Sequence, residues 1–335
     1  MTEELFVTAR ANELIDPGLQ IWTWEVAMYL FLGGVTAGIM MFAAIVALMK
    51  KDEEAPFASD RLAILAPIVL SLGMTTLFMD LEHKLYVFRF YTTFKVLSPM
   101  SWGAWILLLV YPVAILQILS TVRRGVPQAA AQLDRFAIGR MVTDWCEEHR
   151  REISLVAVPI GALLGVYTAI LLSAFSARPF WNTGVLAPLF LTSGLSTAAA
   201  LVALLTKSHR ERAWFTRIDV VLIIIELLLV GLFIINLATG SAKQIEALEC
   251  CVMGGPYTFA FWVLFVGVGL LLPLLFELLE MRGLGAPLAL AAAVLVLVGG
   301  YTLRHVMLEV GQNSTWTSYS TQYDSELLDR LETDH

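Results

Sequence analysis

WEVAMYLFLGGVTAGIMMFAAIVALM, residues 24–49, contains a single charged residue and is long enough to cross a lipid bilayer as a helix. A helical span needs about 20 mostly apolar residues because the hydrocarbon core of a bilayer is roughly 30 Å thick. The same criterion predicts seven further spans, at about 62–79, 102–122, 153–175, 184–206, 218–238, 256–279 and 284–306. The sequence therefore predicts an all-α polytopic membrane protein with eight transmembrane helices.

The composition of the 335-residue chain supports this class. Hydrophobic residues make up 58% of it and charged residues only 15%, which is outside the range of soluble globular proteins. The N-terminal stretch MTEELFVTARANELIDPG has acids and no compact apolar core, so it does not resemble a secretory signal. We expect the first span to insert the chain into the membrane.

Small residues recur at four-residue spacing inside the spans, as in Gly34 and Gly38. Membrane helices associate through such residues because close backbone contact replaces the hydrophobic driving force that lipid does not supply. Short loops between antiparallel spans favour two four-helix bundles, at 24–175 and 184–306. Terminal segments 1–23 and 307–335 flank them.

The Lys and Arg residues predict the orientation of the chain. Most of the 22 basic residues lie in the loops after the odd-numbered spans, which places those loops in the cytoplasm and both termini outside. The outer face is then acidic, which argues against nucleic acid as a partner. Three cysteines, Cys146, Cys250 and Cys251, form no C-x-x-C pattern, so we expect no metal cluster in this chain.

Two acids in the sixth predicted span are candidates for proton transfer. An ionisable side chain inside a span is costly unless it is paired, so it is a functional hypothesis by default. Glu226 lies within the apolar run DVVLIIIELLLVG, and Asp219 precedes it by two helical turns on the same face. The pair can begin a proton route from the cytoplasm, or Glu226 can simply make one interhelical hydrogen bond.

A polar cluster is predicted at the outer ends of the first three spans. The join DLEHKLYVFRFYTTFKVLSPMSWG, residues 80–103, gathers acids, bases and aromatics. Asp80 and His83 share a face if the helix continues that far, and a carboxylate beside an imidazole can exchange protons. Glu25 and Tyr29 lie four residues apart at the mouth of the first span. A solvated helix end for Asp80 and His83, and a first-turn acid favoured by the helix dipole for Glu25, are the alternatives.

Three further residues complete the predicted outer site. Tyr167 lies inside the fourth span, where its phenol needs a hydrogen-bond partner that either a ligand or a backbone carbonyl can supply. Arg178 lies in the next outer loop. Trp24, like the other tryptophans, is also explained as an anchor at the membrane interface.

Two other classes of membrane protein share part of this pattern. A haem b anchor needs pairs of histidines within spans as axial ligands, but only His83 and His305 can meet, both at predicted outer helix ends. A secondary transporter also uses intramembrane acids, although Pro159, Pro188 and Pro273 do not form the paired pattern of broken helices expected there. Both classes remain as alternatives.

Several segments resemble the NrfD/polysulfide reductase membrane-subunit family, in the same order along the chain. They are WEVAMYLFLGGVTAG (24–38), SPMSWGAW (98–105), GVYTAILLSAFSARPFWNT (165–183), LFLTSGLSTAAAL (189–201) and GGYTLRHVMLEVGQ (299–312). The resemblance implies a haem-free membrane subunit of a respiratory oxidoreductase complex in the bacterial cytoplasmic membrane, incomplete as an enzyme by itself. It also implies a bound quinone, menaquinone or ubiquinone, that exchanges electrons with an iron–sulfur subunit on the outer face. A molybdenum-type catalytic subunit commonly completes such a complex.

The resemblance also locates the quinone ring near a fourth-span tyrosine, which Tyr167 matches, and near first-span polar residues. Here the first span begins with Trp22, Trp24 and Glu25 instead of Asn or His. We therefore predict a quinone site formed by Trp24, Glu25, Tyr29, Tyr167 and Arg178, with Asp80 and His83 exchanging protons and Asp219 and Glu226 forming the proton route.

Overall fold

The computed structural model describes residues 22–283, 286–314 and 316. Predictions for residues 1–21 and for the tail beyond Trp316 concern parts of the chain outside this description. Within the described residues there is no β-strand, and eight helices are long and apolar enough to cross a membrane. The prediction of an all-α polytopic fold is confirmed.

The spanning helices follow the predicted order. They are α2 (Trp24–Leu48), α4 (Leu62–Asp80), α6 (Pro99–Leu119), α10 (Arg150–Ser173), α11 (Leu186–Leu205), α12 (His209–Ala238), the continuous pair η2 (Ala260–Leu271) and α14 (Leu272–Met281), and α15 (Ala286–Asn313). Shorter helices join them: α3 (Pro56–Asp60), η1 (Lys84–Tyr86), α5 (Arg89–Thr92), α7 (Val122–Gly125), α8 (Pro127–Leu133), α9 (Ala137–Glu148) and α13 (Ala242–Val252).

Two helix boundaries differ from the prediction by more than a turn. Helix α12 begins at His209 instead of near 218, because the Ser208 side chain caps it by accepting a hydrogen bond from the Glu211 backbone. Helix α15 continues to Asn313, beyond the predicted end at 306. Hydropathy alone misses both extensions, since the added turns are polar.

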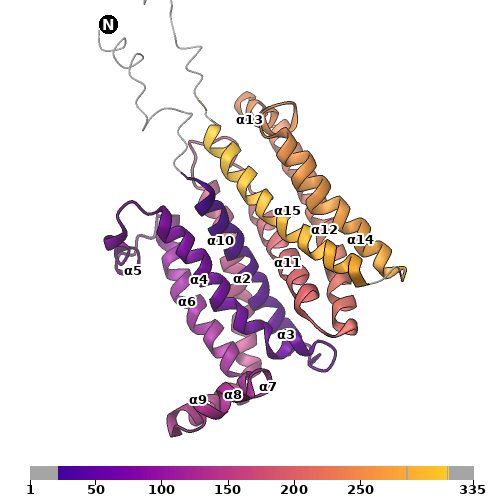
Figure 1. The fold of residues 1–335 in the computed structure, drawn as a ribbon. Helices are drawn as coiled ribbons and strands as arrows, with labels where there is room; N and C mark the ends of the chain where they lie inside the picture. The colour runs from indigo at the N-terminus through magenta and orange to yellow at the C-terminus, as the bar shows by residue number, and fades with distance from the viewer. Residues whose placement is uncertain (1–21, 284–285, 315, 317–335) are drawn as a thin grey trace, which may run out of the picture.

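The helices run alternately in opposite directions (Figure 1). Figure 1 shows α2, α4, α6 and α10 grouped on one side of the molecule and α11, α12, α14 and α15 on the other. We call the end where α2 begins and α15 finishes the terminal side, and the end that carries α3 and α7–α9 the opposite side. The two groups meet where α2 packs against α11. Their separation into independent four-helix bundles stays a prediction.

The contact between α2 and α11 depends on glycine. A β-carbon on Gly38 would lie 2.5 Å from both the Gly194 carbonyl oxygen and the Ala198 side chain. A β-carbon on Gly194 would lie 2.7 Å from the Gly34 carbonyl oxygen. Real side chains do not approach so closely, so the small residues set the distance between these helices.

Ion pairs hold the loops of the opposite side. Arg150 binds Asp52 at 2.8 Å and also donates to the Ser59 hydroxyl at 2.9 Å. Burial alone would raise the pKa of Asp52, but hydrogen bonds from Arg150 and Ser59 hold that pKa below its usual value. Glu211 accepts hydrogen bonds from the Ala58 backbone at 2.8 Å and from the Thr206 hydroxyl at 2.6 Å. These contacts fix the short helix α3 against the start of α12.

We expect Gly38→Ala to destabilise the protein by about 1–3 kcal/mol, because the added methyl group forces α2 and α11 apart. Gly231→Ala in α12 is the matched control, since a β-carbon there meets nothing within 4 Å. Thermal unfolding of the detergent-solubilised variants measures the difference. Equal midpoints for the two variants would show that the α2–α11 distance is not fixed by Gly38.

Candidate functional site

A cavity of about 510 Å³ lies on the terminal side, enclosed by α2, α4, α6, α10 and the segment 81–98. Most of its wall is apolar, and its polar groups are Asp80, three tyrosines and the Trp22 indole. Its lining residues are Trp22, Val26, Tyr29, Leu30, Met74, Leu77, Phe78, Asp80, Leu81, Val87, Phe90, Tyr91, Met100, Gly103, Ala104, Leu107, Tyr167, Leu171 and Leu172. An apolar cavity with a few convergent polar groups is typical of a small-molecule site. We call it the tyrosine pocket.

Tyr29 on α2 and Tyr167 on α10 are the most buried polar side chains of the pocket, with 5% and 4% of their surface exposed. Neither phenol oxygen makes a hydrogen bond within the described residues. Both tyrosines line the cavity, so their hydroxyls are available to a ligand that carries acceptor oxygens. The Tyr167 phenol lies directly against Gly103 of α6, where a β-carbon would overlap its hydroxyl.

Asp80 and Tyr91 close the pocket toward the terminal side. Asp80 is the last residue of α4, and Leu81 after it is extended, so the chain turns over the cavity. Tyr91 lies on α5, where burial raises the pKa of its phenol and keeps the group protonated. The segment 81–98 thus supplies a hydroxyl donor at the mouth of the pocket, beside the Asp80 carboxylate.

Three predicted residues lie outside the pocket lining. Because α4 ends at Asp80, the shared helical face expected for Asp80 and His83 does not form. The His83 ring instead lies near the Tyr86 ring, with the ring centroids 6.3 Å apart. Trp24 is 47% exposed. Glu25 is hydrogen-bonded by the neighbouring Thr23 hydroxyl and acts on Asp80 through its charge.

Arg178 also lies outside the lining, in the loop between α10 and α11. Its guanidinium donates to the Ser314 carbonyl oxygen at 2.9 Å, which ties this loop to the end of α15. Nearby, the indole N–H of the buried Trp181 donates to the Met307 carbonyl oxygen at 2.7 Å. The Trp181 ring also stacks on the Trp22 ring, with centroids 5.8 Å apart. Arg178 therefore belongs to the support behind the Trp22 wall.

A chain of buried polar groups runs through the other half of the molecule. Asp219 and Glu226, both on α12, have only 1% and 2% of their surface exposed. Asp219 accepts a hydrogen bond from the Ser196 hydroxyl of α11 at 2.5 Å and pairs with Glu277 of α14. This first group lies toward the opposite side of the bundle.

The second group of this buried series consists of Glu226 and Arg304. Glu226 lies about 10 Å from Asp219 along α12, because an α-helix rises 1.5 Å per residue. Arg304 is 1% exposed and donates to the Ser193 hydroxyl at 2.5 Å and to the Phe190 carbonyl oxygen at 2.9 Å. Glu226 interacts with both Ser193 and Arg304. The polar groups thus pass from α14 and α12 through two serines of α11 to α15.

The sequence interpretation missed four members of this series: Ser193, Ser196, Glu277 and Arg304. Arg304 lies two residues before the predicted end of the last span at 306, so it was not recognised as a buried charge. The sequence did contain a signal for Arg304 and Glu277. Each is a charged residue within an apolar run, and Glu277 lies in PLLFELLEM. The serines carried no such signal, since their role depends on contacts between helices.

His305 follows Arg304 on α15 and also lies within the helix, not at its end. Its ring stacks on the Tyr301 ring, with the ring centroids 6.0 Å apart. Across the described residues, no group of three or more His, Cys, Asp or Glu side chains is placed to hold a metal ion.

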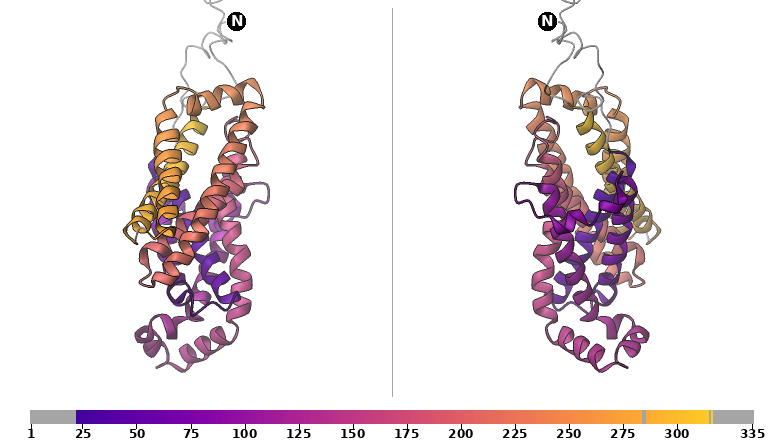
Figure 2. Two further views of the ribbon diagram at one scale, coloured as in Figure 1. Left: turned by 90° about the vertical axis from the view of Figure 1, so that its right-hand side faces the viewer. Right: turned by 90° about the vertical axis from the view of Figure 1, so that its left-hand side faces the viewer.

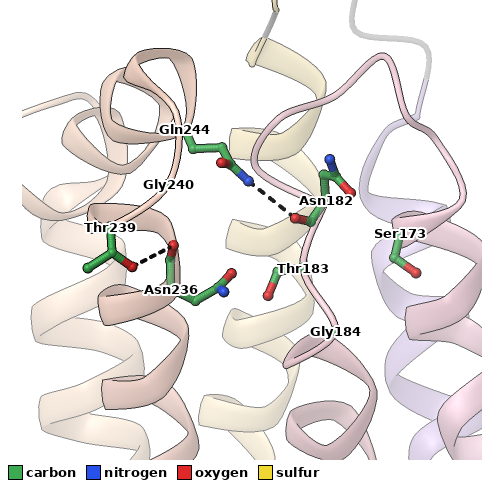
Figure 3. A pocket seen from close by; sticks show the side chains of 8 residues that line it. All are labelled: Ser173, Asn182, Thr183, Gly184, Asn236, Thr239, Gly240 and Gln244. Carbon is green, nitrogen blue, oxygen red and sulfur yellow. Dashed lines mark hydrogen bonds between the residues drawn. The ribbon is translucent and has the colours of Figure 1, made fainter.

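A second hollow of about 490 Å³ opens on the terminal side between the α10–α11 loop and the junction of α12 with α13 (Figure 3). Its side chains are hydroxyls and amides, and Gln244 donates to the Asn182 carbonyl oxygen at 3.2 Å across it. None of its described lining residues is charged. It offers hydrogen bonds but no acid or base, so the tyrosine pocket is the better candidate for chemistry.

Comparison with known proteins agrees with this architecture. The family model described as polysulphide reductase, NrfD, matches residues 12–315. The chain belongs to the NrfD family. It is 30% identical over 305 residues to the protein named NrfD of Escherichia coli (strain K12), covering 87% of this chain and 95% of that protein. It is 26% identical over 304 residues to the C subunit of polysulfide reductase of Wolinella succinogenes, covering 87% and 94%.

Membership of the NrfD family, together with the eight apolar helices, makes this chain a multi-pass membrane protein of that family. The family match extends over both halves of the described structure. The tyrosine pocket and the buried polar series therefore belong to one NrfD unit.

We expect Arg304→Met to destabilise the protein by about 3–5 kcal/mol, because it leaves Glu226 buried without its cation. The double variant Arg304→Met with Glu226→Gln should recover part of that loss. Thermal unfolding of the two single variants and the double variant completes a mutant cycle. Strict additivity would contradict direct coupling of the two residues.

Proposed function

We propose that this NrfD-family chain is the quinone-reactive membrane subunit of a respiratory oxidoreductase complex, with the quinone ring in the tyrosine pocket. One observation carries the proposal: two largely buried tyrosines, whose hydroxyls make no hydrogen bond to a described residue, line an apolar cavity that also contains a carboxylate. A quinone ring presents two carbonyl oxygens as acceptors and carries a long apolar tail. The pocket supplies donors for the oxygens and apolar walls for the rest.

Reduction of a quinone to a quinol takes two electrons and two protons, so the pocket residues have separate roles. Tyr29 and Tyr167 donate hydrogen bonds to the ring oxygens and orient the ring. Asp80 exchanges protons with it at the mouth of the pocket. His83, placed after the helix end, passes protons between Asp80 and water.

The wall between α4 and α6 gives the tail a way into lipid. Phe78 of α4 and Met100 of α6 line the pocket and are also 42% and 45% exposed on the surface. Further down, the Ser71 and Tyr111 hydroxyls are hydrogen-bonded at 3.1 Å and join the same two helices. An apolar tail can leave the pocket above that bond without crossing polar groups.

The electron partner in this proposal docks on the terminal side. The bias of Lys and Arg along the sequence supports an orientation with this side outside the cytoplasm of a bacterial inner membrane. The exposed Trp24, the Glu25 carboxylate and the segment 81–98 form the nearest surface above the pocket. An iron–sulfur subunit bound there, itself attached to a molybdenum-type catalytic subunit, exchanges electrons with the ring.

The buried polar series gives protons a route from the cytoplasm. Glu277 and Asp219 receive them on the opposite side, and Ser196, Glu226, Ser193 and Arg304 continue the route to mid-depth. Turnover that draws protons through this route adds to the membrane potential. Exchange through Asp80 and His83 alone would be electroneutral.

Tyr167→Phe is expected to weaken quinone binding about tenfold, since a lost hydrogen bond in a buried site is worth about 1.5 kcal/mol. Asp80→Asn should lower quinol-linked turnover while leaving quinone affinity near that of the parent, because it removes the proton exchanger and keeps the shape. Steady-state turnover and quinone titration of the intact complex measure both. Tyr111→Phe, outside the pocket, is the control variant. Parental affinity and turnover in both pocket variants would contradict the site.

Glu226→Gln keeps the volume of the side chain but cannot carry a proton. We expect it to slow or abolish proton uptake from the cytoplasmic side during turnover, measured with a pH-sensitive dye in oriented proteoliposomes. Glu249→Gln at the terminal side is the control. Unchanged cytoplasmic uptake in the Glu226 variant would exclude the route while leaving the quinone site intact.

A further inference from the structure

Helix α9 (Ala137–Glu148) has three distinct faces. Thr143 and Cys146 are buried where α9 packs against α6 and α10. Ile138, Met141 and Trp145 share a second face at helical spacing and are 74%, 65% and 49% exposed. The third face is polar and carries Arg140, Asp144 and Glu147. The apolar face is therefore not covered by any described residue of this chain.

Helix α9 is held firmly against the bundle. Arg123, just after the end of α6, contacts three acids of the α8–α9 region: Asp134 at 2.9 Å, Asp144 at 2.7 Å and Glu147 at 3.0 Å. Hydrogen bonds to these acids raise the pKa of Arg123, so it stays charged. The apolar face of α9 is consequently presented in a fixed direction.

The position of α9 places it at the edge of the bilayer. It follows α6 and leads directly into α10, so it lies where two spans leave the membrane, and Figures 1 and 2 show α8 and α9 projecting beyond the helix ends on the opposite side. Ile115 of α6 and Leu155 and Val156 of α10 are about half exposed near these ends. The apolar face of α9 lies at the same end of the bundle as these exposed apolar side chains.

Exposed arginines surround α9. Arg135, Arg140 and Arg151 are exposed in and beside this region. Arg123 contacts three neighbouring acids and offsets part of their negative charge. Exposed arginines next to an apolar helix face are the pattern of a helix that lies in the headgroup region of a membrane.

We propose that α9 is an interfacial helix that binds the membrane leaflet on the opposite side of the bundle. Ile138, Met141 and Trp145 insert among the upper parts of the acyl chains. Arg135, Arg140 and Arg151 contact the phosphates of anionic lipids. This contact fixes the depth of the helical bundle in the membrane. It does not depend on the proposed quinone site.

The test places a fluorescent label at single introduced cysteines of the full chain in lipid nanodiscs. In a Cys250→Ser background, which leaves Cys146 and Cys251 buried, the label is attached at Met141→Cys or Ile138→Cys on the apolar face. The control label is attached at Glu147→Cys on the polar face, where Arg123 keeps its contacts with Asp134 and Asp144. Each variant must unfold at the temperature of its parent. The unlabelled background measures any reaction of the native thiols.

Doxyl-labelled lipids are the quenchers. We expect quenching at 138 and 141 to exceed that at 147 by about threefold, because an interfacial helix lies only about 5–10 Å into the leaflet. We also expect it to rise when phosphatidylcholine is partly replaced by phosphatidylglycerol. Equal quenching at all three positions, or a label at 141 shielded from both lipid and water, would overturn the proposal. No effect of phosphatidylglycerol would overturn the assignment to anionic lipid.

Discussion

The hydrogen bonds of Arg304 and its attraction to the nearby Glu226 are the constraint on which the rest of the structure depends. A guanidinium inside a membrane protein must be surrounded by acceptors, and α11 and α12 supply them through Ser193, the Phe190 carbonyl oxygen and Glu226. Gly34 of α2 leaves the space that the guanidinium occupies, since a β-carbon there would lie 3.0 Å from it. Arg304 thereby fixes α15 against α2, α11 and α12. Because α2 belongs to one half of the fold and the other three helices to the second half, this contact joins the two halves.

This arrangement separates two kinds of chemistry. The tyrosine pocket is built on α2, α4, α6 and α10, where apolar walls surround a few donors. The buried acids lie on α12 and α14, where Ser196 donates a hydrogen bond to Asp219 and Glu277 lies close to it. The close crossing of α2 and α11 lies between them, so a shift of one half moves the other. A quinone-reactive subunit coupled to proton movement needs such a rigid connection between the ring and the proton route.

The spans were predictable from sequence because lipid imposes length and hydropathy directly on each helix. The site was only partly predictable. Tyr29, Asp80 and Tyr167 were predicted together and do line one cavity, since all three lie near the terminal ends of neighbouring spans. His83 was misplaced because α4 ends at Asp80, a boundary that hydropathy does not define. Gly103 carried no signal, since its role appears only when α6 packs against α10.

Photolabelling with an azido-quinone, followed by mass-spectrometric mapping of the intact complex, tests the central claim most directly. The account predicts labels on peptides that contain Tyr29, Tyr91 or Tyr167, with competition by excess unlabelled quinone. It also predicts that the iron–sulfur subunit cross-links to the same side of the bundle. Specific labels confined to the side that carries α3 and α9, or cross-links to the iron–sulfur subunit from that side, would contradict it.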